Sequence, residues 1–416
     1  MRVSDLRGAL RLAVQATSGV TRVTEGVHQS VWSTLGASGG KTMGTTRGLT
    51  GAVYRLIDGI THITGKSTDA AMAALESMFE SESGNKPRSA RAESLLAILN
   101  GVMGDRLAED ASPFTIAMDI RSEAAMHGGV LQPASFATPD AAGKVLLLIH
   151  GLCMNDFKQH AKYQGNATEP GALLAERLGY FPLYLRYNSG LHISQNGKEL
   201  AQQLQQLVEC WPQDIEELSV VAHSMGGLVI RSAMRHAQQQ GAQQQGMNWP
   251  ERVKNLVFLG TPHHGARLER AGNWLDKILE NAPYVKPFAA LGQMRSAGIT
   301  DLRHGNLLQQ DWDGHDRFQL KPDSREPVPL PASINCDTVA ATLAERRGIL
   351  SDRLLGDGLV PLRSALGQHD DAALALTFPD SAQKIVYKTG HMGLLHSPTV
   401  NEQIISWLKA AQPAPF

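Results

Sequence analysis

Residues 218–232 read LSVVAHSMGGLVIRS, where a short apolar run stops at a serine and a helical pattern of apolar residues begins at once. The apolar run is typical of a buried strand, and the positions from Leu228 onward are typical of a helix under a sheet. Ala222 and Gly226 lie two residues before and two after the serine, and both are small, as a tight strand-to-helix turn requires. The usual pattern has glycine at the first of these places. We therefore expect Ser224 to project from the turn at the positive end of a helix dipole.

Strand-like and helix-like segments alternate from about residue 115 onward. Strands are expected at 144–149, 181–187, 218–221, 253–259, 338–343 and 384–387, and helices at 170–178 and 195–210. The low-complexity run AQQQGAQQQG at 237–246 is interpreted as a solvated loop. The stretch of about 264–335 interrupts the alternation and is interpreted as an inserted cap. This pattern predicts an α/β fold with a mostly parallel sheet covered on both faces.

Composition limits the class of protein. The 416 residues include 39 Lys and Arg against 40 Asp and Glu, which does not favour a nucleic-acid partner. Three widely spaced cysteines form neither a disulfide framework nor a zinc pattern, which favours a reducing compartment. The N-terminus lacks the apolar core of a signal peptide, and no apolar stretch is long enough to span a membrane. We expect a cytoplasmic protein.

Residues 1–110 differ from the rest and are predicted to be a helical extension of a domain at 111–416. A weak repeat relates residues 20–27 to residues 53–60, as two similar helices in a hairpin would. Residues 1–66 hold eight Lys and Arg against three Asp and Glu beside an apolar stripe. One hypothesis is peripheral association with an anionic lipid surface. The alternatives are a dimer face, which leaves the oligomeric state open, or packing on the chain's own domain.

A second motif is the strand-like LLIHGL at 147–152, which ends in a His-Gly turn. In such a turn the amide after the glycine points toward a developing oxyanion. Leu152 and Met225 are therefore the predicted pair of N–H donors. The alternative is a strand that ends in an ordinary turn.

Two later motifs each follow a predicted strand. LGDGLVP at 355–361 sets Asp357 between two glycines, either as an acid that orients a histidine or as an ordinary Asp-Gly turn. KIVYKTGHMGLL at 384–395 places His391 in a loop as the candidate base, with His396 as its rival. His263 and His264 are the remaining contenders, interpreted as structural or cleft-lining.

The order of these motifs along the chain makes them specific. Ser224, Asp357 and His391 follow the order nucleophile, acid, histidine, with the oxyanion turn upstream of all three. This order predicts acyl transfer through a covalent intermediate on Ser224. The predicted substrate-binding residues are His150, Gly151, His223 and His263, and the mechanism requires no cofactor and no metal. An acidic turn, DWDGHD at 311–316, lacks the rest of a calcium-loop pattern.

The region of about 92–410 resembles the α/β-hydrolase superfamily, in its bacterial lipase and esterase branch, and is also similar to inositol-deacylase-like hydrolases. The resemblance is carried by IHGL (149–152), RYNSG (186–190), AHSMGGLVIRS (222–232), LGTPHHGA (259–266), DLRHGN (301–306), GDGLVP (356–361) and GHMGLLHSP (390–398). It implies hydrolysis of carboxylic esters, with acyl or lipid esters as the expected substrates. The alternatives are a thioesterase or polyester depolymerase with the same triad, or a non-catalytic scaffold that binds a lipid surface or a partner.

Overall fold

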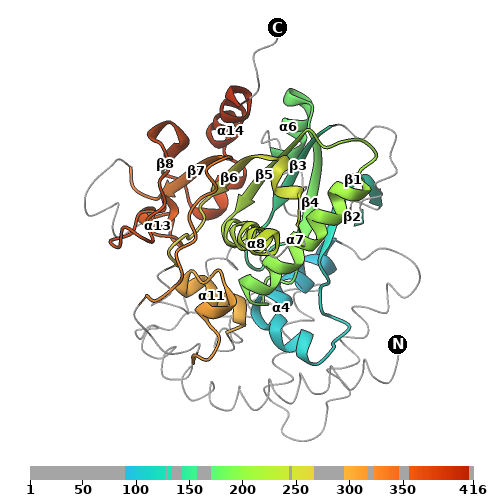
Figure 1. The fold of residues 1–416 in the computed structure, drawn as a ribbon, viewed down its shortest axis with the longest axis vertical. Helices are drawn as coiled ribbons and strands as arrows, with labels where there is room; N and C mark the ends of the chain where they lie inside the picture. The colour runs from blue at the N-terminus through green and yellow to red at the C-terminus, as the bar shows by residue number, and fades with distance from the viewer. Residues whose placement is uncertain are drawn as a thin grey trace, which may run out of the picture. The chain divides into compact units, whose positions relative to one another are not determined.

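The computed structural model describes residues 90–127, 130–133, 143–156, 170–242, 246–266, 295–316, 323–345 and 356–411. Within these ranges eight strands form one sheet, in the order β2-β1-β4-β3-β5-β6-β7-β8 (Figure 1). The strands are β1 (Asp119–His127), β2 (Val130–Pro133), β3 (Lys144–Ile149), β4 (Phe181–Arg186), β5 (Glu217–His223), β6 (Val253–Leu259), β7 (Asn335–Thr342) and β8 (Gln383–Tyr387).

The six strands from β3 to β8 are parallel to one another, and β1 is antiparallel to both β2 and β4. Residues Val145 to Ile149 of β3 are all buried, so this strand is covered on both faces. Parallel strands joined by helical crossovers are buried in this way. Their carboxyl ends meet at one edge of the sheet, which is where ligands bind in open α/β sheets.

The described helices cover both faces of this sheet. They are α4 (Ala90–Glu109), α6 (Pro170–Leu178), α7 (Ile193–Cys210), α8 (Met225–Ala242), α9 (Trp249–Arg252), α11 (Ala297–His304), α13 (Leu362–Ala365) and α14 (Pro398–Ala410), with 3₁₀ turns η3 (Gln309–Asp311), η4 (Asp380–Ala382) and η5 (His391–Leu395). Helices α7 and α8 lie side by side (Figure 1). A side chain at Gly197 of α7 would meet Ser232 of α8 at 2.3 Å, so this close approach requires glycine.

One hydrophobic core lies between the sheet and the pair α6 and α14. Leu146 and Val221 contribute to it from the central strands, and Leu174 and Ile404 contribute from the two helices. Because side chains alternate along a strand, Leu147 and Val220 face the other side of the sheet. The helical crossovers and the two-sided core give the α/β-hydrolase fold that the sequence predicts.

Most predicted elements are confirmed, and two features differ. The hairpin of β1 and β2 was not predicted. The run 237–246, interpreted as a loop, is instead helical as far as Ala242, because α8 continues through the first glutamines. Glutamine has good helix propensity, so the polar composition did not require a loop.

The chain divides into two compact units, of which the larger comprises Ser89–Asp105, Ile116–Arg270 and Arg295–Phe416 and contains the sheet. The smaller comprises Met1–Arg88, Arg106–Thr115 and Ala271–Met294. Only 106–115 of the smaller unit is described, and there the Thr115 hydroxyl donates to the carbonyl of Leu107 at 2.8 Å. The predicted helices before residue 90, the lipid-surface segment and much of the predicted cap lie outside the described residues.

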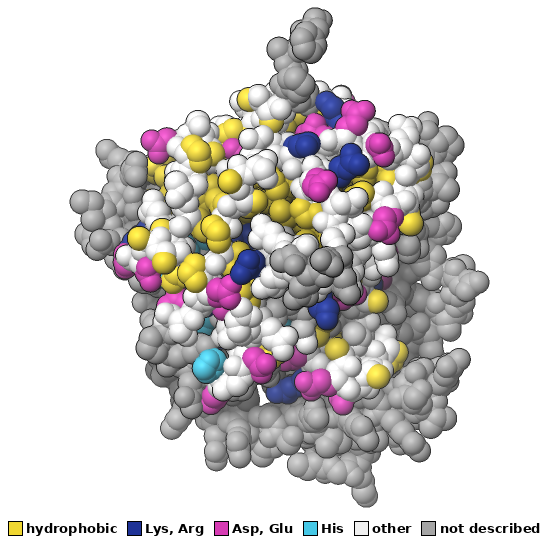
Figure 2. All heavy atoms as spheres, viewed as in Figure 1, with side chains coloured by type: hydrophobic (Ala, Val, Ile, Leu, Met, Phe, Trp, Pro, Cys, Tyr) yellow, Lys and Arg dark blue, Asp and Glu magenta, His cyan; other side chains and the backbone are white. Residues whose placement is uncertain are grey.

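Charges of both signs are interspersed on the face shown in Figure 2, and apolar side chains gather between them in its upper half. This mixture agrees with a formal net charge of −1. None of the helices in the described ranges combines the length and the apolar character that crossing a bilayer requires.

Candidate active site

Ser224 links the end of β5 to the start of α8 by itself. Its φ is 54°, in the left-handed region that a residue with a side chain rarely adopts. The backbone N–H of Ser224 donates to the carbonyl of Leu259 at 2.8 Å, which fixes the turn against β6. A side chain at Gly226 would begin 2.7 Å from the carbonyl oxygen of His150, and one at Gly227 would meet Thr261 at 2.1 Å. Close packing on both sides therefore holds the serine in a strained conformation, at a cost of about 1–3 kcal/mol.

Asp357 and His391 form a buried hydrogen-bonded pair. The Nδ1 atom of His391 lies 2.6 Å from Oδ2 of Asp357, and the two residues are 6% and 3% exposed. The other carboxylate oxygen accepts the backbone N–H groups of Leu359 at 2.9 Å and Val360 at 2.7 Å. The N–H of His391 donates to the Asp357 carbonyl at 3.1 Å. The carboxylate fixes the proton on Nδ1 and leaves Nε2 of the imidazole as an acceptor.

His391 and Ser224 each contact the end of β6: the imidazole packs against Gly260, and the Ser224 N–H donates to the carbonyl of Leu259, the residue before it. A side chain at position 260 would begin 3.2 Å from the imidazole of His391, and the φ of Gly260 is 59°. Among the described residues no hydrogen bond joins Ser224 Oγ to His391. Such bonds are often long in a protein without substrate and shorten in the complex.

His396 is the alternative candidate for the base. It contributes to a small cavity that is also lined by Leu148, Val221 and His223. Burial lowers the pKa of His396. Among the described residues the Asp357 carboxylate bonds His391 and makes no bond to His396.

The His-Gly turn lies on the first turn of α8. Gly151 is next to the nucleophile, since a side chain there would begin 3.0 Å from Ser224 Cβ. Leu152 and Met225, the predicted donors, are both buried. The first N–H groups of a helix have no partner within the helix, so the amide of Met225 is available to a ligand. The structure therefore brings both predicted donor residues to the serine.

His150, predicted to bind substrate, is fully buried. Its ring stacks on Tyr187 with centroids 4.3 Å apart, and its Nδ1 lies 2.8 Å from the Gly151 carbonyl oxygen. Burial lowers the pKa of His150 to about 4, so the ring is neutral at neutral pH. Its position suits support of the loop rather than contact with a ligand.

His223, also predicted to bind substrate, is buried directly before the nucleophile. Its Nε2 lies 3.3 Å from the carbonyl oxygen of His391, and the two rings are 4.7 Å apart. Burial and the neighbouring His391 hold the pKa of His223 well below its ordinary value. A neutral His223 therefore connects the strand that carries the serine to the loop that carries the histidine.

His263, also predicted to bind substrate, lies in the loop after β6. Its ring lies 3.3 Å from Arg231 and contacts the rings of Phe258 and Phe378, and its backbone bonds Thr261 and Arg325. Burial, followed by the positive charge of Arg231, holds the pKa of His263 well below its ordinary value. His263 lines a small cavity together with Arg231, His264 and Arg325, as a cleft-lining residue would.

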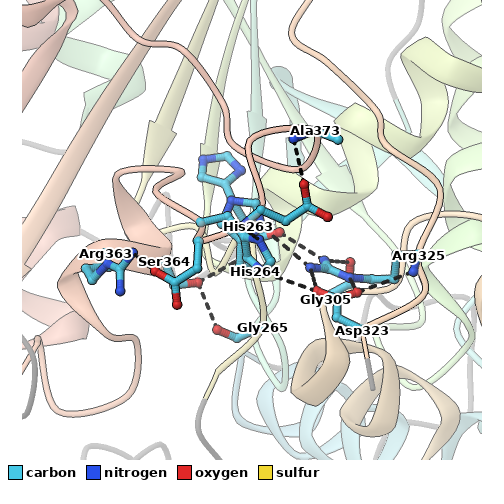
Figure 3. Close-up of polar contacts among 12 residues, drawn as sticks. His263, His264, Gly265, Gly305, Asp323, Arg325, Arg363, Ser364 and Ala373 are labelled. Carbon is cyan, nitrogen blue, oxygen red and sulfur yellow. Dashed lines mark hydrogen bonds and ion pairs between the residues drawn. The ribbon is translucent and has the colours of Figure 1, made fainter. Parts of the chain in front are cut away.

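The adjacent polar network joins the loop after β6 to later segments (Figure 3). Arg325 donates to Asp323 at 2.6 Å and to the Gly305 carbonyl at 2.8 Å. The backbone N–H of His264 donates to Ser364 Oγ at 3.1 Å, and its ring Nε2 lies 2.9 Å from the Gly367 carbonyl oxygen. These bonds fix the loop as part of the scaffold. The acidic turn that follows is also scaffold, because buried Asp311 accepts the N–H groups of Leu307 and Leu308.

The residues after β4 were not predicted to belong to the site. RYNSG (186–190) carries part of the resemblance, yet Tyr187 donates to the carbonyl of His150 and Ser189 accepts the N–H of Cys153, so both bind the His-Gly turn. The available signal was a strand followed at once by side chains that donate or accept hydrogen bonds. These residues belong to the candidate site.

Comparisons with known proteins describe what the chain is similar to. Residues 117–297, less than half of the chain, match a family model described as a domain of unknown function (DUF7379). No curated protein sequence matches the chain. Among solved structures, the mature Bacillus licheniformis lipase BlEst2 is 17% identical with a TM-score of 0.40, over 67% of this chain and 95% of that one. Lipase 1 from Pelosinus fermentans is 12% identical with a TM-score of 0.43, over 66% and 100%. Staphylococcus hyicus lipase is 14% identical with a TM-score of 0.38, over 65% and 96%.

Proposed function

We propose that this protein hydrolyses carboxylic esters through an acyl intermediate on Ser224. The observation that carries the proposal is the buried His391–Asp357 pair, at 2.6 Å, beside a serine held in a left-handed turn. A serine hydroxyl is a weak nucleophile until a positioned base takes its proton. The pair supplies that base in the required tautomer.

In the first half-reaction Ser224 Oγ attacks the carbonyl carbon while His391 Nε2 accepts the hydroxyl proton. The resulting oxyanion accepts hydrogen bonds from the backbone N–H groups of Leu152 and Met225. Collapse of the tetrahedral intermediate breaks the bond to the alcohol oxygen, and His391 returns the proton to that leaving group. The products are an alcohol and an ester of Ser224.

In the second half-reaction water attacks the acyl carbon and His391 accepts a proton from it. Collapse releases the carboxylic acid and restores the serine hydroxyl with the same proton. Asp357 stabilises the imidazolium in both steps, and its remaining oxygen stays bound to Leu359 and Val360. These two half-reactions need no cofactor.

An apolar acyl group suits the surroundings of the pair. Leu343 at the end of β7 is the large apolar side chain that the described residues expose, at 49%. One of its methyl groups lies 3.8 Å from where a side chain at Gly390 would begin, next to His391. Acyl or lipid esters are therefore the proposed substrates, and a thioester is tested beside them.

The test combines covalent labelling with rates on a series of esters. Wild type and Ser224→Ala are treated with a fluorophosphonate probe, and rates are measured on p-nitrophenyl esters of increasing chain length and on a matched thioester. Labelling of wild type alone, with ester hydrolysis that Ser224→Ala abolishes, supports the proposal. A folded wild-type protein that is neither labelled nor active refutes it and favours the scaffold alternative.

A further inference from the structure

The N–H of Leu152 can keep one direction, toward the oxyanion, only if the plane of its peptide group is fixed. A trans peptide is planar, so its N–H points opposite to its carbonyl. The N–H of Leu152 shares one plane with the carbonyl of Gly151. Whatever holds that carbonyl therefore aims the amide.

The carbonyl oxygen of Gly151 has two partners, the His150 ring, whose Nδ1 lies 2.8 Å from it, and the backbone N–H of Met154, which donates to it at 3.3 Å. The bond to His150 is the shorter of the two. Since a carbonyl only accepts, Nδ1 carries the proton of this neutral ring. The other nitrogen, Nε2, is buried and has no hydrogen-bond partner among the described residues. The ring thus has one bond within the turn, and its orientation must come from packing.

Tyr187 supplies that packing and a second bond. Its ring lies parallel to the ring of His150, with 19° between the planes. Its hydroxyl donates to the carbonyl of His150 at 2.8 Å. Tyr187 therefore fixes both the ring and the peptide group that precedes Gly151.

Ser189 restrains the far side of the same turn. Its Oγ accepts the N–H of Cys153 at 3.1 Å. Cys153 has a φ of 58°, which is strained for a residue with a side chain. Gly101 lies against it so closely that a side chain there would meet the Cys153 sulfur at 2.4 Å. The bond to Ser189 and the packing of Gly101 therefore hold the turn in its strained conformation.

The segment that carries these two residues is itself anchored. Arg186 forms a buried ion pair with Glu93 at 2.8 Å. Asn188 donates to the carbonyl of Gly104 at 3.0 Å and accepts the N–H of Gly190 at 3.0 Å. Tyr187 lies between these anchors, so its hydroxyl is a fixed point from which the turn is aligned.

We infer that Tyr187 is a positioning residue, which aims the Leu152 amide at the oxyanion by holding His150. The inference rests on the proposed ester hydrolysis. It gives His150 a role that full burial permits, because a buried ring acts through its neighbours and not on a ligand. Removal of one oxyanion donor costs about 10²–10³ in kcat, and a misdirected donor should cost less.

The experiment compares Tyr187→Phe with Tyr180→Phe. Both variants remove a buried hydroxyl, but the Tyr180 hydroxyl bonds Ser219 near the amino end of β5, at the other end of this strand from Ser224. Tyr187→Phe keeps the stacked ring and should lower kcat by about tenfold with little change in KM. It should weaken inhibition by phenylboronic acid, which forms a tetrahedral serine adduct, by a similar factor. Tyr180→Phe should change neither quantity, whatever it does to stability.

A second pair of variants covers the case in which Tyr187→Phe fails to fold. His150→Asn retains an N–H donor near the place of Nδ1, and His150→Leu does not. The asparagine variant should recover most of the kcat that the leucine variant loses. If Tyr187→Phe matches Tyr180→Phe in kcat and boronate inhibition, or if His150→Asn and His150→Leu are equally active, the inference is wrong while the proposed function stands. A wild-type protein that hydrolyses no ester overturns both.

Discussion

Among the described residues of the larger unit, two Asp–His pairs join an imidazole Nδ1 to a buried carboxylate, and they have similar geometry. In one, Nδ1 of His391 lies 2.6 Å from Oδ2 of Asp357. In the other, Nδ1 of His192 lies 2.9 Å from Oδ2 of Asp301. Both carboxylates are buried. Judged by the pair alone, either could orient a base.

Their surroundings differ. The ring of His192 is stacked on Trp312, with centroids 3.6 Å apart and 5° between the planes. Asp301 also accepts the N–H of Ile193 at 2.9 Å and the side-chain amide of Asn306 at 2.9 Å. This pair connects the start of α7 to α11 and serves the scaffold. The ring of His391 instead lies 4.7 Å from that of His223, the residue directly before the strained Ser224. A serine close to a hydrogen-bonded Asp–His pair is what makes this pair a candidate site.

The largest expected effect separates the two pairs by activity. Ser224→Ala and His391→Ala should each lower kcat by about 10⁵ or more, because members of a triad act as one unit. His192→Ala should leave kcat nearly unchanged, since its ring has no part in the reaction. Steady-state rates on p-nitrophenyl acetate measure all three. If His192→Ala were folded but inactive, the catalytic histidine would belong to the His192–Asp301 pair and not to the His391–Asp357 pair.

Replacement of Asp357 should lower kcat by a smaller factor than replacement of Ser224 or His391. Asp357→Asn keeps the shape of the side chain but no longer fixes the proton on Nδ1, and it should lower kcat by about 10⁴. The same variant should still react slowly with a fluorophosphonate, because Ser224 is unchanged. Equal rates for Asp357→Asn and wild type would remove Asp357 from the mechanism.

The His391–Asp357 pair could be predicted from the sequence because strand ends, glycines and motif order mark it locally. Ser224 is flanked by a strand and a helix that have different periodicities, and Asp357 and His391 each follow a strand. The parallel topology then brings these ends together without further information. The same logic predicted β3, β6 and α6 to the residue.

The structural pair could not be predicted, because it depends on a contact between residues 109 positions apart in the chain. His263 shows a different limit of the sequence. It follows a strand as His391 does, but Arg231 and not a carboxylate lies beside it, and Arg231 comes from a helix whose orientation the sequence does not specify. The hairpin of β1 and β2 was missed for a related reason, since residues such as Arg121 and Ser122 break the apolar pattern of a strand.

Histidines without a carboxylate partner should dominate the loss of stability in acid. Burial lowers the pKa of His150 and of His264 to about 4. Since the unfolded value is about 6.5, the unfolded chain takes up these protons first as the pH falls. Their contribution is therefore present above pH 6.5 and is lost between about pH 6.5 and 4. For His150 the loss is on the order of 3 kcal/mol, and for the partly exposed His264 it is smaller.

Urea unfolding at several pH values through this window measures the effect. His150→Asn removes one titrating group, so its stability should fall less steeply with acid than that of wild type. The midpoint for each protein is read against its own value at neutral pH, which cancels any loss of packing. Parallel curves for the two proteins would show that His150 does not take part in the acid transition.

The smallest expected effect tests the structural pair directly. Asp301→Asn replaces a buried carboxylate that accepts bonds from Ile193, His192 and Asn306. An amide has one acceptor oxygen, so at least one of these donors loses its partner, at a cost of about 1–3 kcal/mol in the free energy of unfolding. The kcat of the folded protein should stay close to that of wild type, in contrast to Asp357→Asn. Urea unfolding and steady-state rates on the same preparation measure both quantities. If Asp301→Asn were as stable as wild type but inactive, α7 and α11 would belong to the catalytic machinery and the distinction between the two pairs would fail.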